Sequence, residues 1–249
     1  EIGRCRPYYS DMTLRGIPVS GVNIEFTPGI FYSAFTSGRT LRAIEGDSLE
    51  RPVFEQNILH GKIGIGKKQG THFYITYFHA EDDTNSLSPR PEIDSIHFLK
   101  ARSNDVVGAE MRLLLFKKKL LIDGEGAASL LTRDVNAPEF DYDDAIVPVW
   151  AVDYLKPNFS SSADYAYNLQ ATLKLKTTTI SGGWRWIGAG YTTLGNPYLV
   201  NDRNTYHGRI NQAFARKKVN IAVFLRHHND NLLNCKKSTS TVLSYGANA

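Results

Sequence analysis

The sequence predicts an all-β protein, an antiparallel transmembrane β-barrel of about ten or more strands. Two observations favour this fold class. Apolar and polar residues alternate along many short segments, which is typical of strands with one apolar and one polar face. The segments also come in pairs, with short turns inside the pairs and long polar loops between them. Barrels of bacterial outer membranes are built from short turns and long loops in the same alternation.

The alternation is clearest in segment 165–176. Tyr167, Leu169 and Leu173 fall on one face of a strand there, and Asn168 and Gln170 fall on the other. The tail 239–245 is a candidate for a further strand. The predicted strand pairs are 21–26 with 30–39, 60–66 with 71–80, 106–116 with 120–132, 165–176 with 178–193, and 206–215 with 219–228.

The connections support the same fold. Thr27-Pro28-Gly29 predicts a tight turn, because proline presets φ and glycine accepts a positive φ. Basic clusters mark other turns. We divide the chain into an N-terminal extension or first strand, 1–18, and a barrel, 19–249. The basic turns are Lys67-Lys68, Lys117-Lys118-Lys119 and Arg216-Lys217-Lys218, and the long loops are 40–55, 81–105, 133–164 and 195–204.

Composition excludes a helical membrane protein. The chain has 249 residues, of which 42% are hydrophobic and 22% are charged, as in ordinary globular domains. The longest apolar stretches, 113–116 and 145–152, are far shorter than the ~20 residues of a membrane helix. The net charge of +4 comes from scattered basic residues, so no nucleic-acid partner is expected.

No catalytic or metal-binding constellation is recognisable, so neither an enzyme nor a cofactor is predicted. The seven histidines are scattered. Two acidic clusters, 81–83 and 141–144, contain oxygen ligands that Ca²⁺ prefers, but they lack the spacing of a calcium-binding loop. We interpret both clusters as solvated loops.

In a membrane barrel the polar face of the strands lines the interior. The charged side chains predicted on that face would pair across a narrow lumen or line a wet channel. A solvated face of a soluble sheet predicts the same residues, and this alternative stays open. The lumen-facing candidates are Glu110, Arg112, Asp123, Glu125, Lys174, Arg185, Arg209 and Arg226.

Several stretches resemble large outer-membrane β-barrel proteins of Bacteroidota, a mostly uncharacterised family. The resemblance runs over most of residues 7–232. It implies a barrel in the bacterial outer membrane, and because such proteins are typically longer, it implies a fragment. The stretches are PYYS (7–10), GVNIEFTPG (21–29), FHAEDDTNS (78–86), IGAGYTTLG (187–195) and NDNL (229–232).

Some barrels of Bacteroidota are accessory subunits of the type IX secretion or barrel-assembly machineries, and others handle nutrients. The leading expectation is therefore a structural or accessory subunit of an envelope complex, in protein export or outer-membrane assembly. Its expected partners are outer-membrane lipid and other envelope proteins. Two alternatives remain, a diffusion or nutrient-uptake channel and a soluble β-sandwich that binds glycans or protein.

Overall fold

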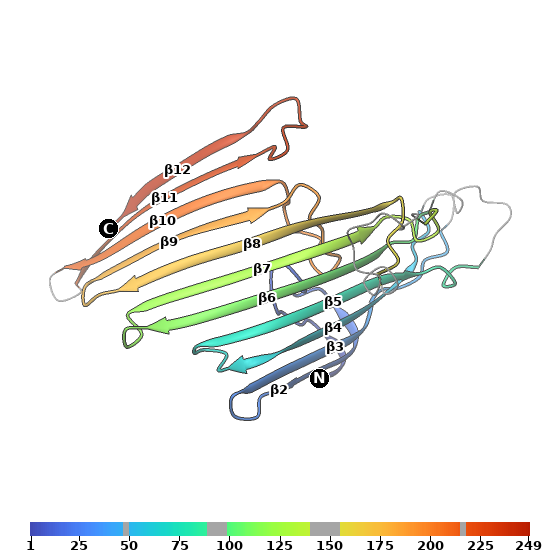
Figure 1. The fold of residues 1–249 in the computed structure, drawn as a ribbon, viewed down its shortest axis with the longest axis horizontal. Coiled ribbons are helices and arrows are strands. Elements are labelled where there is room, and N and C mark those ends of the chain that lie inside the picture. Colours follow the sequence, from blue (N-terminus) through green and yellow to red (C-terminus); the bar gives the residue numbers. More distant parts are fainter. Residues whose placement is uncertain (47–49, 89–98, 140–154, 215–217) are drawn as a thin grey trace.

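The computed structural model describes residues 1–46, 50–88, 99–139, 155–214 and 218–249 (Figure 1). Every element in these ranges is a β-strand, and no helix in them is long and apolar enough to cross a membrane. The strands are β1 (Ile2–Cys5), β2 (Val19–Phe26), β3 (Phe31–Leu41), β4 (Glu55–Gly66), β5 (His72–Asp83), β6 (Ser103–Leu115), β7 (Leu120–Thr132), β8 (Ser161–Lys174), β9 (Thr178–Ile187), β10 (Arg203–Phe214), β11 (Val219–Asp230) and β12 (Thr241–Asn248).

All strands belong to one antiparallel sheet of 12 strands, which are ordered in space as they are in the chain. The all-β, antiparallel prediction is confirmed, and so are the five strand pairs. The tail is also a strand, β12. Short turns gather at one end of the sheet and long connections at the other (Figure 1).

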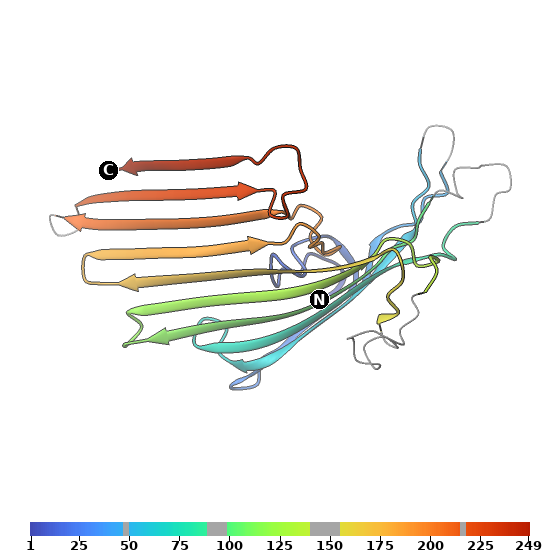
Figure 2. The ribbon, with the colours of Figure 1, turned by 45° about the horizontal axis from the view of Figure 1, so that its top comes forward.

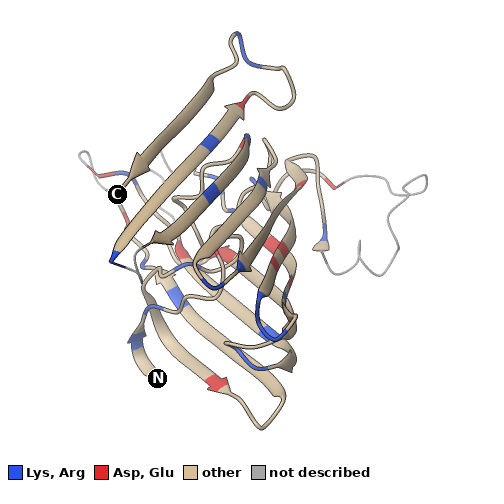
Figure 3. Cartoon of the chain, turned by 90° about the vertical axis from the view of Figure 1, so that its left-hand side faces the viewer, with Lys and Arg blue, Asp and Glu red and all other residues tan. Residues whose placement is uncertain are grey.

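The predicted closure into a barrel is not present. Within the described ranges β1 pairs only with β2, and β12 pairs only with β11. Closure would require β1 and β12 to pair, but β1 has only 4 residues. Figure 3 shows a strongly curved, open sheet with these two strands apart.

The tight turns follow the sequence chemistry. In the β2–β3 turn Gly29 has φ of 66°, as the Pro-Gly pair predicts. In the β6–β7 turn Phe116, Lys117 and Lys118 take φ of 51°, 55° and 68°. Positive φ at Lys117 and Lys118, the two central residues of the turn, matches the right-handed twist of a hairpin.

One predicted strand, 178–193, is too long. β9 ends at Ile187, and residues 188–202 turn away from the sheet edge. The Asp164 side chain holds the start of this segment, because it accepts a hydrogen bond from the backbone N of Gly190 at 2.7 Å. It also fills the space where a Cβ on Gly188 would lie, 2.2 Å from the carboxylate.

The register gives the sheet two distinct faces. We call the inner face the one that carries Tyr74, Glu110, Glu125, Asn168 and Arg185, which lie side by side across β5–β9. The outer face carries the alternate residues, which are mainly apolar. Two segments cover part of the inner face, residues 6–18 and residues 188–202, and we call them the inner segments (Figure 2).

The apolar core lies between the inner face and the inner segments. Phe78 and Val106 from the sheet are fully buried against Met12, Leu14 and Tyr191 of the inner segments. Burial of this kind is the main favourable term in folding. The core therefore depends on the inner segments, which lie outside the regular strands.

We expect Phe78→Ala to lower the free energy of unfolding by about 3–5 kcal/mol, the usual cost of removing a buried phenylalanine side chain. Urea unfolding of the purified protein measures this change. Phe35→Ala is the matched control, because Phe35 is 44% exposed on the outer face. Equal losses in the two variants would show that the inner segments do not form a core.

Candidate functional site

The candidate site is the inner face together with the inner segments. The two segments are far apart in the chain but are joined by hydrogen bonds. The hydroxyl of Tyr191 donates to Met12 O at 2.6 Å, and that of Thr193 donates to Thr13 O at 2.8 Å. Burial raises the pKa of the Tyr191 hydroxyl well above its usual value, so the hydroxyl keeps its proton. Two further bonds are Asn196 Nδ2 to Asp11 O at 2.7 Å and Arg15 N to Gly195 O at 3.0 Å.

A buried asparagine of β6 fixes the second segment to the sheet. Asn104 Oδ1 accepts the backbone N of Leu194 at 2.9 Å, and Asn104 Nδ2 approaches Thr192 O at 3.3 Å. Ser129 of β7 donates to the same Thr192 carbonyl. An unpaired buried amide costs free energy, so these bonds make the segment a fixed part of the interior.

The first segment is held by polar and aromatic contacts. Ser10 donates to Glu125, and Asp11 forms an ion pair with Arg185 at 3.1 Å. The ring of Tyr9 stacks on His60, with centroids 4.0 Å apart. These contacts place residues 6–18 over β4 and β7–β9.

A polar cavity of about 400 Å³ remains between the first segment and the sheet. Its charges are largely paired. Lys62 Nζ lies 2.7 Å from Glu110, and Arg112 pairs with Asp123 across β6–β7. The lining residues include Tyr8, Tyr9, Tyr32, Lys62, His72, Tyr74, Glu110, Arg112, Asp123, Glu125, Asn168 and Gln170.

The register places all of the lumen-facing candidates on the inner face. Glu110, Arg112, Asp123 and Glu125 come together at the polar cavity, whereas Arg185 holds the first inner segment. Of the remaining three candidates, Lys174 lies at the turn end of β8, and Arg209 and Arg226 lie on β10 and β11, nearer to β12. That this face lines a lumen remains a prediction.

Some cavity residues were not predicted as candidates, although the sequence contains a signal for them. Lys62 alternates with Ile63, and Tyr74 alternates with Phe73, so both belong to the polar face of predicted strands. The stacked rings of Tyr32 and Tyr74, with centroids 4.6 Å apart, depend on register between strands. The inner segments carry no alternation that would reveal their place.

The acidic cluster 81–83 is structural. Asp82 is buried and accepts hydrogen bonds from Gln56 Nε2 at 2.8 Å and from Arg102 N at 3.0 Å. The second cluster, 141–144, lies outside the described residues. In the parts of the chain that are described, no group of three potential metal ligands occurs, and both cysteines, Cys5 and Cys235, are free.

Asp202 connects the second inner segment to the β11–β12 loop. It accepts the backbone N of Leu232 at 2.8 Å and that of Asn231 at 3.1 Å, and it pairs with Lys236. Burial acts to raise the pKa of Asp202, but Lys236 and the two backbone donors outweigh it. The pKa of this carboxyl therefore lies below its usual value.

Comparison of the chain with known protein families and with curated proteins finds no match. The functional argument therefore depends on the two faces, the inner segments and the cavities.

We expect Gly195→Ala to separate the inner segments, because an added Cβ would lie 2.3 Å from Thr13 O and 2.9 Å from the Phe78 ring. Faster proteolysis within residues 6–18 should report the change. Gly208→Ala is the control, since its Cβ would meet nothing within 4 Å. Unchanged cleavage in both variants would contradict this packing.

Asp202 should contribute to acid sensitivity. A lowered pKa in the folded state stabilises the protein above the unfolded pKa of about 3.9, and this stabilisation is lost as the pH falls through the folded pKa. Urea midpoints measured from pH 6 down to pH 3 should therefore fall less steeply for Asp202→Asn than for the parent protein. Parallel curves would assign the acid sensitivity to other groups.

Proposed function

We propose that the chain forms part of the wall of an outer-membrane β-barrel and serves as a structural or accessory subunit of an envelope complex, in protein export or outer-membrane assembly. The observation that carries this proposal is the outer face, which presents a band of apolar side chains across the sheet. Phe73, Leu169 and Val223 are 46%, 46% and 51% exposed on β5, β8 and β11. A continuous exposed apolar surface of this extent marks a membrane or protein partner.

The height of the band supports a bilayer as the partner. On β8 the outward positions run from Tyr165 to Leu173 without a charge. A membrane-spanning strand needs about 9–11 residues. The length of the apolar run therefore matches the hydrocarbon thickness.

Polar groups bound the band at both ends. Toward the long connections the outer face carries Glu81 and Asp105, and toward the short turns exposed lysines such as Lys67 and Lys118 follow. Aromatic rings lie toward the loop side of the band, where Tyr167 stacks with Tyr165 and with Trp186, with ring centroids 6.4 Å apart in each pair. Aromatic side chains favour the membrane interface.

The free edges of β1 and β12 place a condition on this proposal. In lipid every backbone polar group must be paired, so only closed barrels are stable there. The barrel we propose therefore includes further strands, which pair with both edges. This condition agrees with the greater length of the Bacteroidota proteins that the sequence resembles.

The filled inner face favours the accessory role over an open channel. The inner segments are bonded to the sheet through Asn104 and Ser10, and the polar cavity beside them contains paired charges. Long connections at one end offer contact surface for other envelope proteins. Planar-bilayer recording separates the two roles, because steady ion-selective openings would contradict the accessory role.

Flotation with lipid vesicles tests membrane insertion. We expect the purified full chain to require detergent and to float with vesicles after dilution. A chain that stays monodisperse in plain buffer and does not float would contradict membrane insertion and favour a soluble binding module, although its single sheet is not the β-sandwich expected from the sequence. Purification from native outer membranes in mild detergent should bring along the partner envelope proteins.

A charge placed on the outer face should hinder insertion. We expect Leu169→Lys to cost ~2–4 kcal/mol near the bilayer centre. The inward-facing Thr172→Lys on the same strand is the matched control. The measurement is the folded fraction in vesicles across a urea series, and equal effects of the two variants would argue against lipid at the outer face.

A further inference from the structure

The inner face of β9–β11 carries four arginines that the proposed function does not use. They lie in four successive rows of the inner face. The rows pass through Arg203, Thr205, His207 and Arg209 of β10. Arg185 of β9 pairs with Thr205, and Arg226 of β11 pairs with His207. We call Arg203, Arg185, Arg226 and Arg209 the arginine ladder.

The ladder runs along the strands rather than across them. Successive residues on one face of a strand are about 6.8 Å apart, which follows from a rise of ~3.4 Å per residue. The four rows therefore span ~20 Å. A single small anion reaches only one or two of these rows.

The charge of the ladder is poorly compensated. Arg185 pairs with Asp11, which also serves Arg15 at 3.1 Å. Arg209 bonds to a neutral partner, Asn211 Oδ1, at 2.9 Å. Like charges held together on a partly buried surface repel one another, and a bound anion removes this repulsion.

The other two arginines have no acidic partner in the described parts of the chain. Arg203 Nε is buried there without an acceptor. Asp230, which faces Arg203 across β10–β11, lies 3.8 Å from Lys236 instead. Arg226 has no carboxylate within ion-pair distance in the same ranges.

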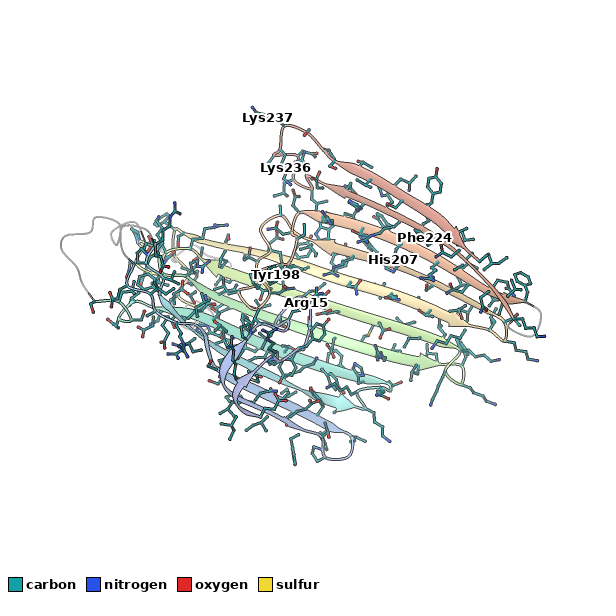
Figure 4. All side chains as sticks on the ribbon, turned by 180° about the vertical axis from the view of Figure 1, so that it is seen from behind. Arg15, Tyr198, His207, Phe224, Lys236 and Lys237 are labelled. Carbon is teal, nitrogen blue, oxygen red and sulfur yellow. The ribbon has the colours of Figure 1, made fainter. Side chains whose placement is uncertain are left out.

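Two cavities give a ligand access to the ladder. The first, about 180 Å³, is lined by Arg15, Arg203 and Tyr198, and the second, about 440 Å³, by Arg209, His207 and Phe224. Both include Arg185, Thr205 and Arg226 in their lining, so they are neighbours. Figure 4 shows Arg15 and Tyr198 close together, with His207 and Phe224 further toward the turn end.

We propose that the arginine ladder binds an extended polyanion that carries several phosphate or carboxylate groups. Guanidinium groups bind both oxyanions through paired N–H donors, and this geometry makes arginine better suited to them than lysine. Tyr198 of the second inner segment lines the groove at its loop end. The site goes beyond the proposed function and does not depend on membrane insertion.

Binding is tested with the full chain in a zwitterionic detergent by isothermal titration. Short-chain polyphosphate and an oligogalacturonate are the two probes, and inorganic phosphate is the single-anion comparison. If only polyphosphate binds, the ligand carries phosphate groups, and if only the oligogalacturonate binds, it carries carboxylate groups. If both bind, the site recognises oxyanions of either kind. Each of these results supports the ladder if the affinity exceeds that for inorganic phosphate.

The decisive variant is R203Q/R226Q, because neither side chain forms an ion pair with any residue that the structure describes. Charge-assisted hydrogen bonds contribute ~1.5–3 kcal/mol each, so the affinity should fall roughly tenfold or more per arginine. K117Q/K118Q removes the same charge at the β6–β7 turn and should change the affinity less than about twofold, since exposed charges contribute little. R203K/R226K keeps the charge and should retain part of the binding.

Three results would overturn the proposal. One is the absence of saturable binding to either polyanion by a protein whose circular dichroism shows the folded sheet. Another is an equal loss of affinity in R203Q/R226Q and K117Q/K118Q, which would indicate unspecific attraction. The third is inorganic phosphate binding as tightly as the polyanions. Flotation with vesicles is read separately, so failure of membrane insertion is not confused with failure of this site.

Discussion

The continuous backbone register of the sheet is the constraint on which the rest of the structure depends. Each strand from β3 to β11 pairs with both neighbours over most of its length, so the faces of one strand determine the faces of the next. A slip by one residue at β6–β7 would turn Glu125 outward and bring Gly124 inward. The only shift recorded in the described pairings lies at Arg39 and Leu41, near the loop end.

Local alternation explains how much of the fold was predictable. Strand pairs, basic turns and the faces of residues such as Glu110 and Arg226 follow from a period of two, which is visible within each segment. The open edges could not be predicted, because closure depends on whether β1 and β12 meet. That depends on the summed curvature of the ten strands between them. The core could not be predicted either, since Met12 and Leu14 have no local pattern and gain their burial from β5, β6 and residue 191.

The inner face is divided into two regions of different chemistry. Over β4–β8 cations and carboxylates neutralise each other, as Lys62 does with Glu110, and the inner segments cover much of the surface. Over β9–β11 arginines predominate and the cover ends near Tyr198. The first region provides rigidity, whereas the second leaves room and positive charge available.

The hydrogen bond between Tyr191 and Met12 joins residues that are 179 positions apart. Contacts between distant parts of a chain slow folding, because a large loop must close before they form. Residues 6–18 precede the strands that they cover, but their partners Tyr191 and Thr193 follow β9 in the chain. Until Tyr191 is in place the buried residues of β5 and β6 are only partly covered, and transiently exposed apolar surface of this kind promotes aggregation.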